Sequence, residues 1–112
     1  MTILYEDAVS EQLPATDTTI YTCPATAKTA HIIFANATNE DAANTTVTVN
    51  IVQSGGSVAV TNRYIPPTTI TAGTSDGLAD IISCVLKPGD FISAVAGDAS
   101  RINLKFGIKE IY

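Results

Sequence analysis

The sequence has no Trp, one His, one Met and two Cys, and only 15% of its 112 residues are charged. A structural zinc site needs four Cys or His ligands in close pairs, whereas Cys23, His31 and Cys84 are isolated. Phosphate binding needs several basic residues on one face, and here six Lys and Arg stand against eleven Asp and Glu. These deficits argue against a metal site and against nucleic acid as the main partner.

The motifs of common enzyme classes are also missing. There is no Gly-x-Ser-x-Gly nucleophile elbow, no phosphate-binding Gly-Lys-Ser/Thr loop and no pair of catalytic carboxylates. His31 lies in an apolar segment without a nucleophile or carboxylate in suitable spacing, so a hydrogen-bonded strand histidine is the better interpretation. We expect a protein that is not an enzyme and that uses no cofactor.

No apolar run is long enough for a membrane-spanning helix, which requires ~20 residues; the longest runs, such as residues 32–35, are much shorter. The first thirteen residues contain acidic but no basic side chains, and they lack the apolar segment of a secretory signal. We therefore expect synthesis in a cytoplasm and no membrane partner.

The pairing of the two cysteines is open. Cys23 and Cys84 are 61 residues apart in the sequence. This separation suits a disulfide between two sheets, and it equally suits two unrelated thiols in the core.

β-Branched residues dominate the composition, with 13 Ile, 8 Val and 16 Thr against five Leu, and such residues favour an extended backbone. Apolar segments bounded by Gly, Pro, Asn and Asp predict about eight strands, at residues 18–22, 30–37, 46–53, 58–65, 68–71, 78–86, 91–96 and 101–108. Turns at this spacing are typical of an all-β, antiparallel two-sheet β-sandwich, either jelly-roll or immunoglobulin-like.

The predicted sandwich occupies residues 18–112, and residues 1–17 are predicted to form an N-terminal arm. Ile3, Leu4 and Tyr5 form a small apolar group in this arm. Such a group is suited to adding a strand to the sheet edge of a partner, or it packs on its own domain. Ile111 and Tyr112 at the C-terminus invite the same two interpretations.

The strand over residues 46–53 alternates clearly. The apolar residues Val47, Val49 and Ile51 point one way. The polar residues Thr46, Thr48 and Asn50 point the other way. The polar face is expected to contact water or a neighbouring subunit, with simple β propensity as the alternative explanation for its threonines.

The order of these features resembles small β-sandwich structural proteins in the virions of tailed bacteriophages. The similarity covers residues 18–112, nearly the whole chain. It rests on a Tyr-Thr-Cys-Pro-Ala step, an Asn-rich turn, a Thr/Val strand, a Gly-Gly hairpin and a Leu-Lys-Pro-Gly-Asp turn, at residues 21–25, 36–44, 46–52, 55–56 and 86–90.

The resemblance implies a non-enzymatic virion component. We expect a capsid decoration or cement protein that binds the major capsid protein or other virion proteins and self-associates, with a trimer favoured. A tail, baseplate or head-fibre component is the alternative. A glycan-binding β-sandwich is a third hypothesis, which the low number of aromatic residues, seven in all, makes weaker because glycan sites usually expose aromatics; Tyr64 is the residue to test.

Overall fold

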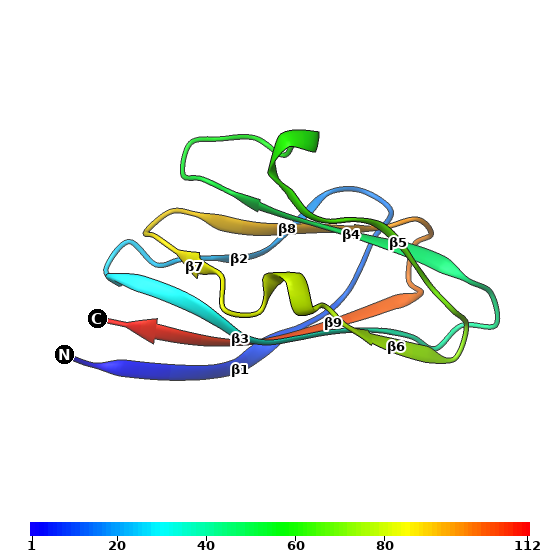
Figure 1. Cartoon of the computed structure of the whole chain (residues 1–112), viewed down its shortest axis with the longest axis horizontal. Coiled ribbons are helices and arrows are strands. Elements are labelled where there is room, and N and C mark those ends of the chain that lie inside the picture. The colour runs from blue at the N-terminus through cyan, green and yellow to red at the C-terminus, as the bar shows by residue number, and fades with distance from the viewer.

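In a computed structural model, the backbone is described for residues 1–112 and the side chains for residues 1–5 and 12–112. Over this backbone the chain forms nine strands in two facing sheets (Figure 1). The strands are β1 (Ile3–Gln12), β2 (Thr18–Thr22), β3 (Thr29–Asn39), β4 (Thr45–Val52), β5 (Arg63–Ile70), β6 (Thr74–Gly77), β7 (Val85–Leu86), β8 (Phe91–Ala96) and β9 (Ile102–Ile111).

The two sheets have the strand order of a jelly roll. The first sheet has the order β1-β9-β3-β6, with β7 also paired to β3, and the second has the order β2-β8-β4-β5. Each sheet therefore mixes strands from both halves of the chain, as two interleaved Greek keys do. The predicted antiparallel two-sheet β-sandwich is confirmed, and the strand order selects its jelly-roll form.

The core lies between the sheets and is almost wholly aliphatic. In β9 the side chains of Ile102, Leu104, Phe106 and Ile108 alternate inward along the strand and are buried. Val47 and Val49 of β4 belong to the same buried cluster. Each such side chain contributes about 1.5–3 kcal/mol when it is fully buried, so this cluster is the main source of stability.

The connection between β4 and β5 is longer than the tight Gly-Gly hairpin predicted from the sequence. It comprises residues 53–62, so the strand expected at 58–65 begins late. The Asn62 side chain explains the difference, because its Oδ1 accepts hydrogen bonds from Asn50 Nδ2 (2.6 Å) and from the backbone N of Ala59 (3.1 Å). These bonds fold the segment into a loop that ends in a 3-10 turn.

Pro66 and Pro67 were expected to separate two strands, and this expectation is wrong. Both prolines lie inside β5. β5 is an edge strand, where a missing N–H is tolerated, and its pairing with β4 shifts register between Val47 and Val49.

The strand expected over residues 78–86 is also wrong in most of its length. Residues 79–81 form a 3-10 turn that buries Ile81, and Ser83 has a positive φ of 75° that redirects the chain, so only the two residues of β7 are extended. The loop expected at residues 73–77 instead supplies β6, which pairs with β3.

β1 forms one edge of the first sheet. It pairs antiparallel with β9, from Ile3 opposite Ile111 to Gln12 opposite Asn103. β1 lies within the span predicted as an N-terminal arm; the side chains of residues 6–11 in that span lie outside the described residues. The division of the chain at residue 17 stays a prediction.

The molecule is elongated along its strands, with extents of 46 × 26 × 20 Å. One end, the terminal end, holds both termini and the β2–β3, β4–β5 and β7–β8 connections (Figure 1). The opposite end, the loop end, holds the β1–β2, β3–β4, β5–β6 and β8–β9 connections. The β6–β7 connection runs alongside β3; the other successive connections fall at opposite ends because paired strands run antiparallel.

Candidate functional surfaces

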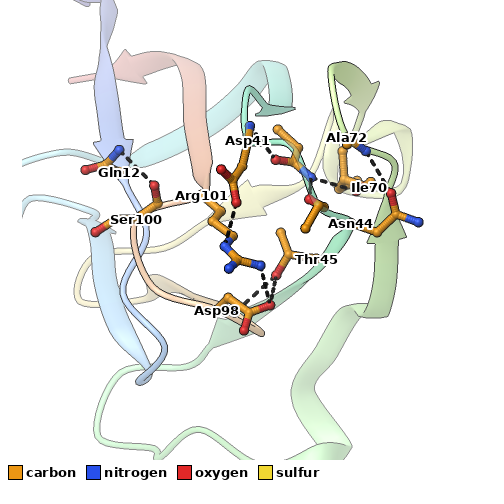
Figure 2. Close-up of polar contacts among 11 residues, drawn as sticks. Gln12, Asp41, Asn44, Thr45, Ile70, Ala72, Asp98, Ser100 and Arg101 are labelled. Carbon is orange, nitrogen blue, oxygen red and sulfur yellow. Dashed lines mark hydrogen bonds and ion pairs between the residues drawn. The ribbon is translucent and has the colours of Figure 1, made fainter.

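A polar cluster ties together the connections of the loop end (Figure 2). The Arg101 guanidinium lies 2.7 Å from Asp41 Oδ2 through Nε and 3.4 Å from Asp98 Oδ2 through Nη1. Thr45 Oγ1 donates to Asp98 Oδ2 (3.0 Å) and accepts from the backbone N of Asp98 (3.1 Å). These contacts join the β3–β4 and β8–β9 turns, so we assign the cluster a structural role.

Asn39 and Asn44 complete the loop end (Figure 2). The Asn39 side chain is buried; its Nδ2 donates to the carbonyl oxygens of Ala43 and Ile70, both at 2.9 Å, and its Oδ1 accepts from Asp41 N at 3.0 Å. Asn44 Oδ1 accepts from the backbone N of Ala72 at 2.9 Å. The Asn residues of this turn therefore replace backbone pairing where β3 and β4 end.

The Leu-Lys-Pro-Gly-Asp turn has a similar structural explanation. The Asp90 carboxylate accepts a hydrogen bond from the backbone N of Lys87 and one from the backbone N of Ser54, each at 2.9 Å. Gly89 has a φ of +85°, and a Cβ built there would lie 2.4 Å from Ser54 Oγ. The turn thus requires Gly and Asp in order to lock the β7–β8 connection against the β4–β5 loop.

A buried carboxylate links the sheets near the terminal end. Glu110 of β9 is 2% exposed and accepts hydrogen bonds from the hydroxyl of Tyr21 in β2 and from the hydroxyl of Tyr112 (2.9 Å). An inward carboxylate interrupts the apolar alternation of β9, yet the strand continues to Ile111 because these hydroxyl groups replace water.

Both cysteines are free in the structure, Cys23 buried and Cys84 partly exposed. Burial raises the pKa of the Cys23 thiol, and the carboxylates of Glu110 and Asp90 raise it further. Burial also raises the pKa of the Cys84 thiol. A raised pKa lowers the thiolate fraction at neutral pH, so neither side chain has the character of a reactive thiol.

The polar face predicted for β4 is largely not a surface. Thr46 is half-buried, but Thr48 and Asn50 are only 6% and 2% exposed. β4 lies between β8 and β5, and Asn50 Nδ2 donates to Ala59 O (2.8 Å) in the loop that follows β4. The expectation of an exposed face is therefore wrong for Thr48 and Asn50.

Apolar side chains gather on the outer face of the first sheet. Tyr5 and Phe34 are 69% and 49% exposed there, and Ile3 and Ile33 are exposed beside them. Ile111 pairs with Ile3 across β9 and β1, and it is partly exposed. We call Ile3, Tyr5, Ile33, Phe34 and Ile111 the outer patch. Leu4 alternates to the other side of β1 and is exposed, and Tyr112 packs partly against the core.

The outer patch depends on a bulge in β3. Ile32 pairs with Ile108 and Phe34 with Gly107, so Ile33 is the extra residue. The side chains of Ile33 and Phe34 then lie over Gly107, where a Cβ would approach Phe34 Cβ to 3.2 Å and Ile33 Cγ1 to 3.4 Å. A near-continuous apolar run such as residues 30–37 is typical of a central strand that is buried on both faces or packed against a neighbour. β3 does lie between β9 and β6, but the bulge places the side chains of Ile33 and Phe34 on the surface. Gly107 in an alternating strand was the sequence signal for this feature.

A shallow hollow of about 480 Å³ lies at the terminal end between β4, the β4–β5 loop and β7. Tyr64, Asn62 and Asp90 are among its lining residues. Both carboxylate oxygens of Asp90 already accept backbone hydrogen bonds.

His31 is hydrogen-bonded to Thr29 (3.2 Å), which confirms its interpretation as a strand histidine. Among residues 1–5 and 12–112 no group of three or more His, Cys, Asp and Glu is arranged to hold a metal ion.

No family model matches this chain, and no curated protein matches its sequence. Solved structures do match its fold. A chain from Bacillus endospore appendages, described as a family of disulfide-linked pili, is 16% identical with a TM-score of 0.55, and the match covers 98% of this chain and 88% of that chain. A chain of infectious bursal disease virus is 13% identical with a TM-score of 0.51. That match covers 98% of this chain and 33% of the viral chain, so this chain spans about a third of it.

These similarities show the fold. In the described part of the chain, no helix has the length and apolar character needed to cross a membrane.

Proposed function

We propose that this chain is a non-enzymatic structural subunit of a tailed-bacteriophage virion, which decorates or cements the capsid shell and self-associates, with trimers favoured. The outer patch carries the proposal. Fully buried aromatic side chains cover about 150–250 Å² each, so Tyr5 and Phe34 at 69% and 49% exposure leave roughly 200 Å² uncovered between them. With three Ile residues added, the patch reaches about 400 Å², within the range of the largest apolar patches on monomers, which often mark interaction surfaces.

The polar residues support a structural role. The carboxylates of Asp41, Asp90 and Asp98 accept hydrogen bonds or ion pairs that hold turns together, and Glu110 joins the two sheets. Catalysis needs such groups to face a substrate rather than the protein's own backbone. These polar contacts hold the turns and the two sheets in place, and a rigid fold suits a subunit of an assembly.

The similar structures support the same direction. One comes from a pilus and the other from a virus particle, and jelly rolls are frequent in viral capsids. An antiparallel sandwich with an exposed apolar sheet face suits packing against neighbouring subunits.

The proposal is tested by adding the purified chain to phage particles that lack it and sedimenting them. We expect the wild-type chain to sediment with the particles, and the I33T/F34T variant to bind at least about tenfold more weakly. Val60, 72% exposed on the β4–β5 loop, provides the matched control V60T, which should bind normally. A chain that remains monomeric in light scattering and does not sediment with particles contradicts the proposal.

The same particles distinguish the alternative location. Cryo-microscopy with a labelled chain places it on the head shell if it is a decoration protein, and on the tail, baseplate or head fibres if it is one of those components. Glycan binding has one observation in its favour, since Tyr64 is 47% exposed beside the hollow. A glycan-array signal that Y64A abolishes and V60T preserves would establish that function instead.

A further inference from the structure

Basic side chains gather at the terminal end. Lys28 lies in the β2–β3 connection, Lys87 in the β7–β8 connection and Arg63 at the start of β5, all exposed. Lys109 lies within β9, further from this end, where it pairs with Tyr5 of β1 and with His31 of β3. Among the described side chains, none of these four forms an ion pair. The described acidic side chains nearby are Asp90, which accepts hydrogen bonds from two backbone N–H groups, and the buried Glu110.

Acidic side chains gather at the loop end. Asp17 precedes β2, Glu40 and Asp41 follow β3, and Asp98 follows β8. Arg101 is the basic residue among them, and it pairs with Asp41 and Asp98. Asp17 and Glu40 are exposed and have no ion pair with a described side chain.

The two ends cannot neutralise one another within a single copy. The long dimension is 46 Å, whereas charges in about 0.1 M salt are screened beyond about 10 Å. Of the other described charges, Asp80 lies beside the middle of β3. Asp76 and Lys105, one acidic and one basic, pair with residues 37 and 36 of β3 in the half toward the loop end. Glu6, Asp7 and Glu11 belong to β1. Opposite charges at the two ends become close only when two copies meet end to end.

We propose that the terminal end of one copy binds the loop end of a second copy. Charge complementarity selects this occupant, because Lys28, Arg63 and Lys87, which form no ion pair with a described side chain, match the carboxylates at the other end. Ile3 and Leu4, both more than 40% exposed beside the cations, supply apolar area for the same contact. The contact is heterologous, so it links copies in a row or closes into a ring such as a trimer. This inference rests on the self-association in the proposed function.

Exchange of charges between the ends tests the contact. The variant K28E/K87E carries acidic groups at both ends, and the variant D17K/E40K carries basic groups at the loop end as well as at the terminal end. Each variant alone should lose self-association in sedimentation velocity. An equal mixture should recover it, because each contact then joins an acidic end to a basic end. For the wild type, the Kd should rise about tenfold between roughly 20 mM and 500 mM NaCl.

The matched control is D80K, which makes the same charge change as the single variant E40K but lies beside the middle of β3, and it should associate like the wild type. Association that ignores salt and survives in both end variants overturns the end-to-end contact. The contact is also overturned if both variants lose association and their mixture does not recover it. If end variants still bind particles while I33T/F34T does not, the proposed function stands without this contact. If the wild-type chain neither self-associates nor binds particles, the proposed function itself is refuted.

Discussion

Gly89 offers a quantitative test of how the β7–β8 turn is built. Its φ of +85° is one that an L residue rarely adopts, and a Cβ there would lie 2.4 Å from Ser54 Oγ and 2.9 Å from Ser54 Cβ. Ser54 has little freedom to move away, because its backbone N donates to Asp90 Oδ1. The substitution G89A therefore combines a backbone strain with a steric clash.

The two costs can be separated with a second glycine. Gly55 has a φ of +80° but nothing within 4 Å of a built Cβ, so G55A measures the backbone cost alone, about 1–2 kcal/mol. Overpacking adds about 1–3 kcal/mol, so G89A should lower the free energy of unfolding by about 2–5 kcal/mol in total.

Urea denaturation followed by circular dichroism measures both values. In the background S54G, which removes both clashing atoms, the cost of G89A should fall to that of G55A. The reasoning is refuted if G89A and G55A cost the same within about 0.5 kcal/mol, or if S54G leaves the difference unchanged.

Three further outcomes follow from the structure. E110A should lower the free energy of unfolding by about 2–4 kcal/mol, because the Tyr21 hydroxyl loses a charged acceptor, and Y21F should add little once Glu110 is gone; additive costs would contradict the link. The pKa of Cys23 is raised above its ordinary value of 9.0 by burial and by the carboxylates of Glu110 and Asp90, so above pH 9.0 the thiol ionises more readily in the unfolded chain and the free energy of unfolding should fall. The fall should be shallower in C23A, and equal pH profiles for the two proteins would argue against it. I33T/F34T should change stability by less than about 1 kcal/mol, because both side chains are about half exposed, and a larger loss in urea melts would make the outer patch a core feature.

The sequence predicted best the strands whose limits are set locally. β2 and β8 coincide with the predicted residues 18–22 and 91–96, because Pro24, Gly89 and Gly97 punctuate the chain at their borders. β5 was divided in two because Pro66 and Pro67 normally interrupt a strand. Their tolerance depends on β5 being an edge strand, which is a property of the whole sheet.

The outer patch was likewise predicted only in part from the sequence. Ile3, Tyr5 and Ile111 were predicted as contact candidates because they are apolar residues that lie outside the predicted strands. Ile33 and Phe34 were missed because one extra residue in β3 moves side chains to the opposite face. Alternation assigns residues to two faces, but it does not report a bulge or a loop that covers a face.

The separation of charge between the two ends could be recognised only once the topology was known. The order of the charged residues along the connections nevertheless indicates it. Each antiparallel strand returns the chain to the opposite end, so consecutive connections alternate between the ends. Asp17 precedes β2, Lys28 follows it, Glu40 follows β3 and Arg63 follows the β4–β5 loop, so the sign of charge alternates with the connections. A net charge of −5 conceals this pattern, because it averages one basic end with one acidic end. A low content of charged residues can therefore still orient two copies relative to one another, provided that the charges lie where the copies meet.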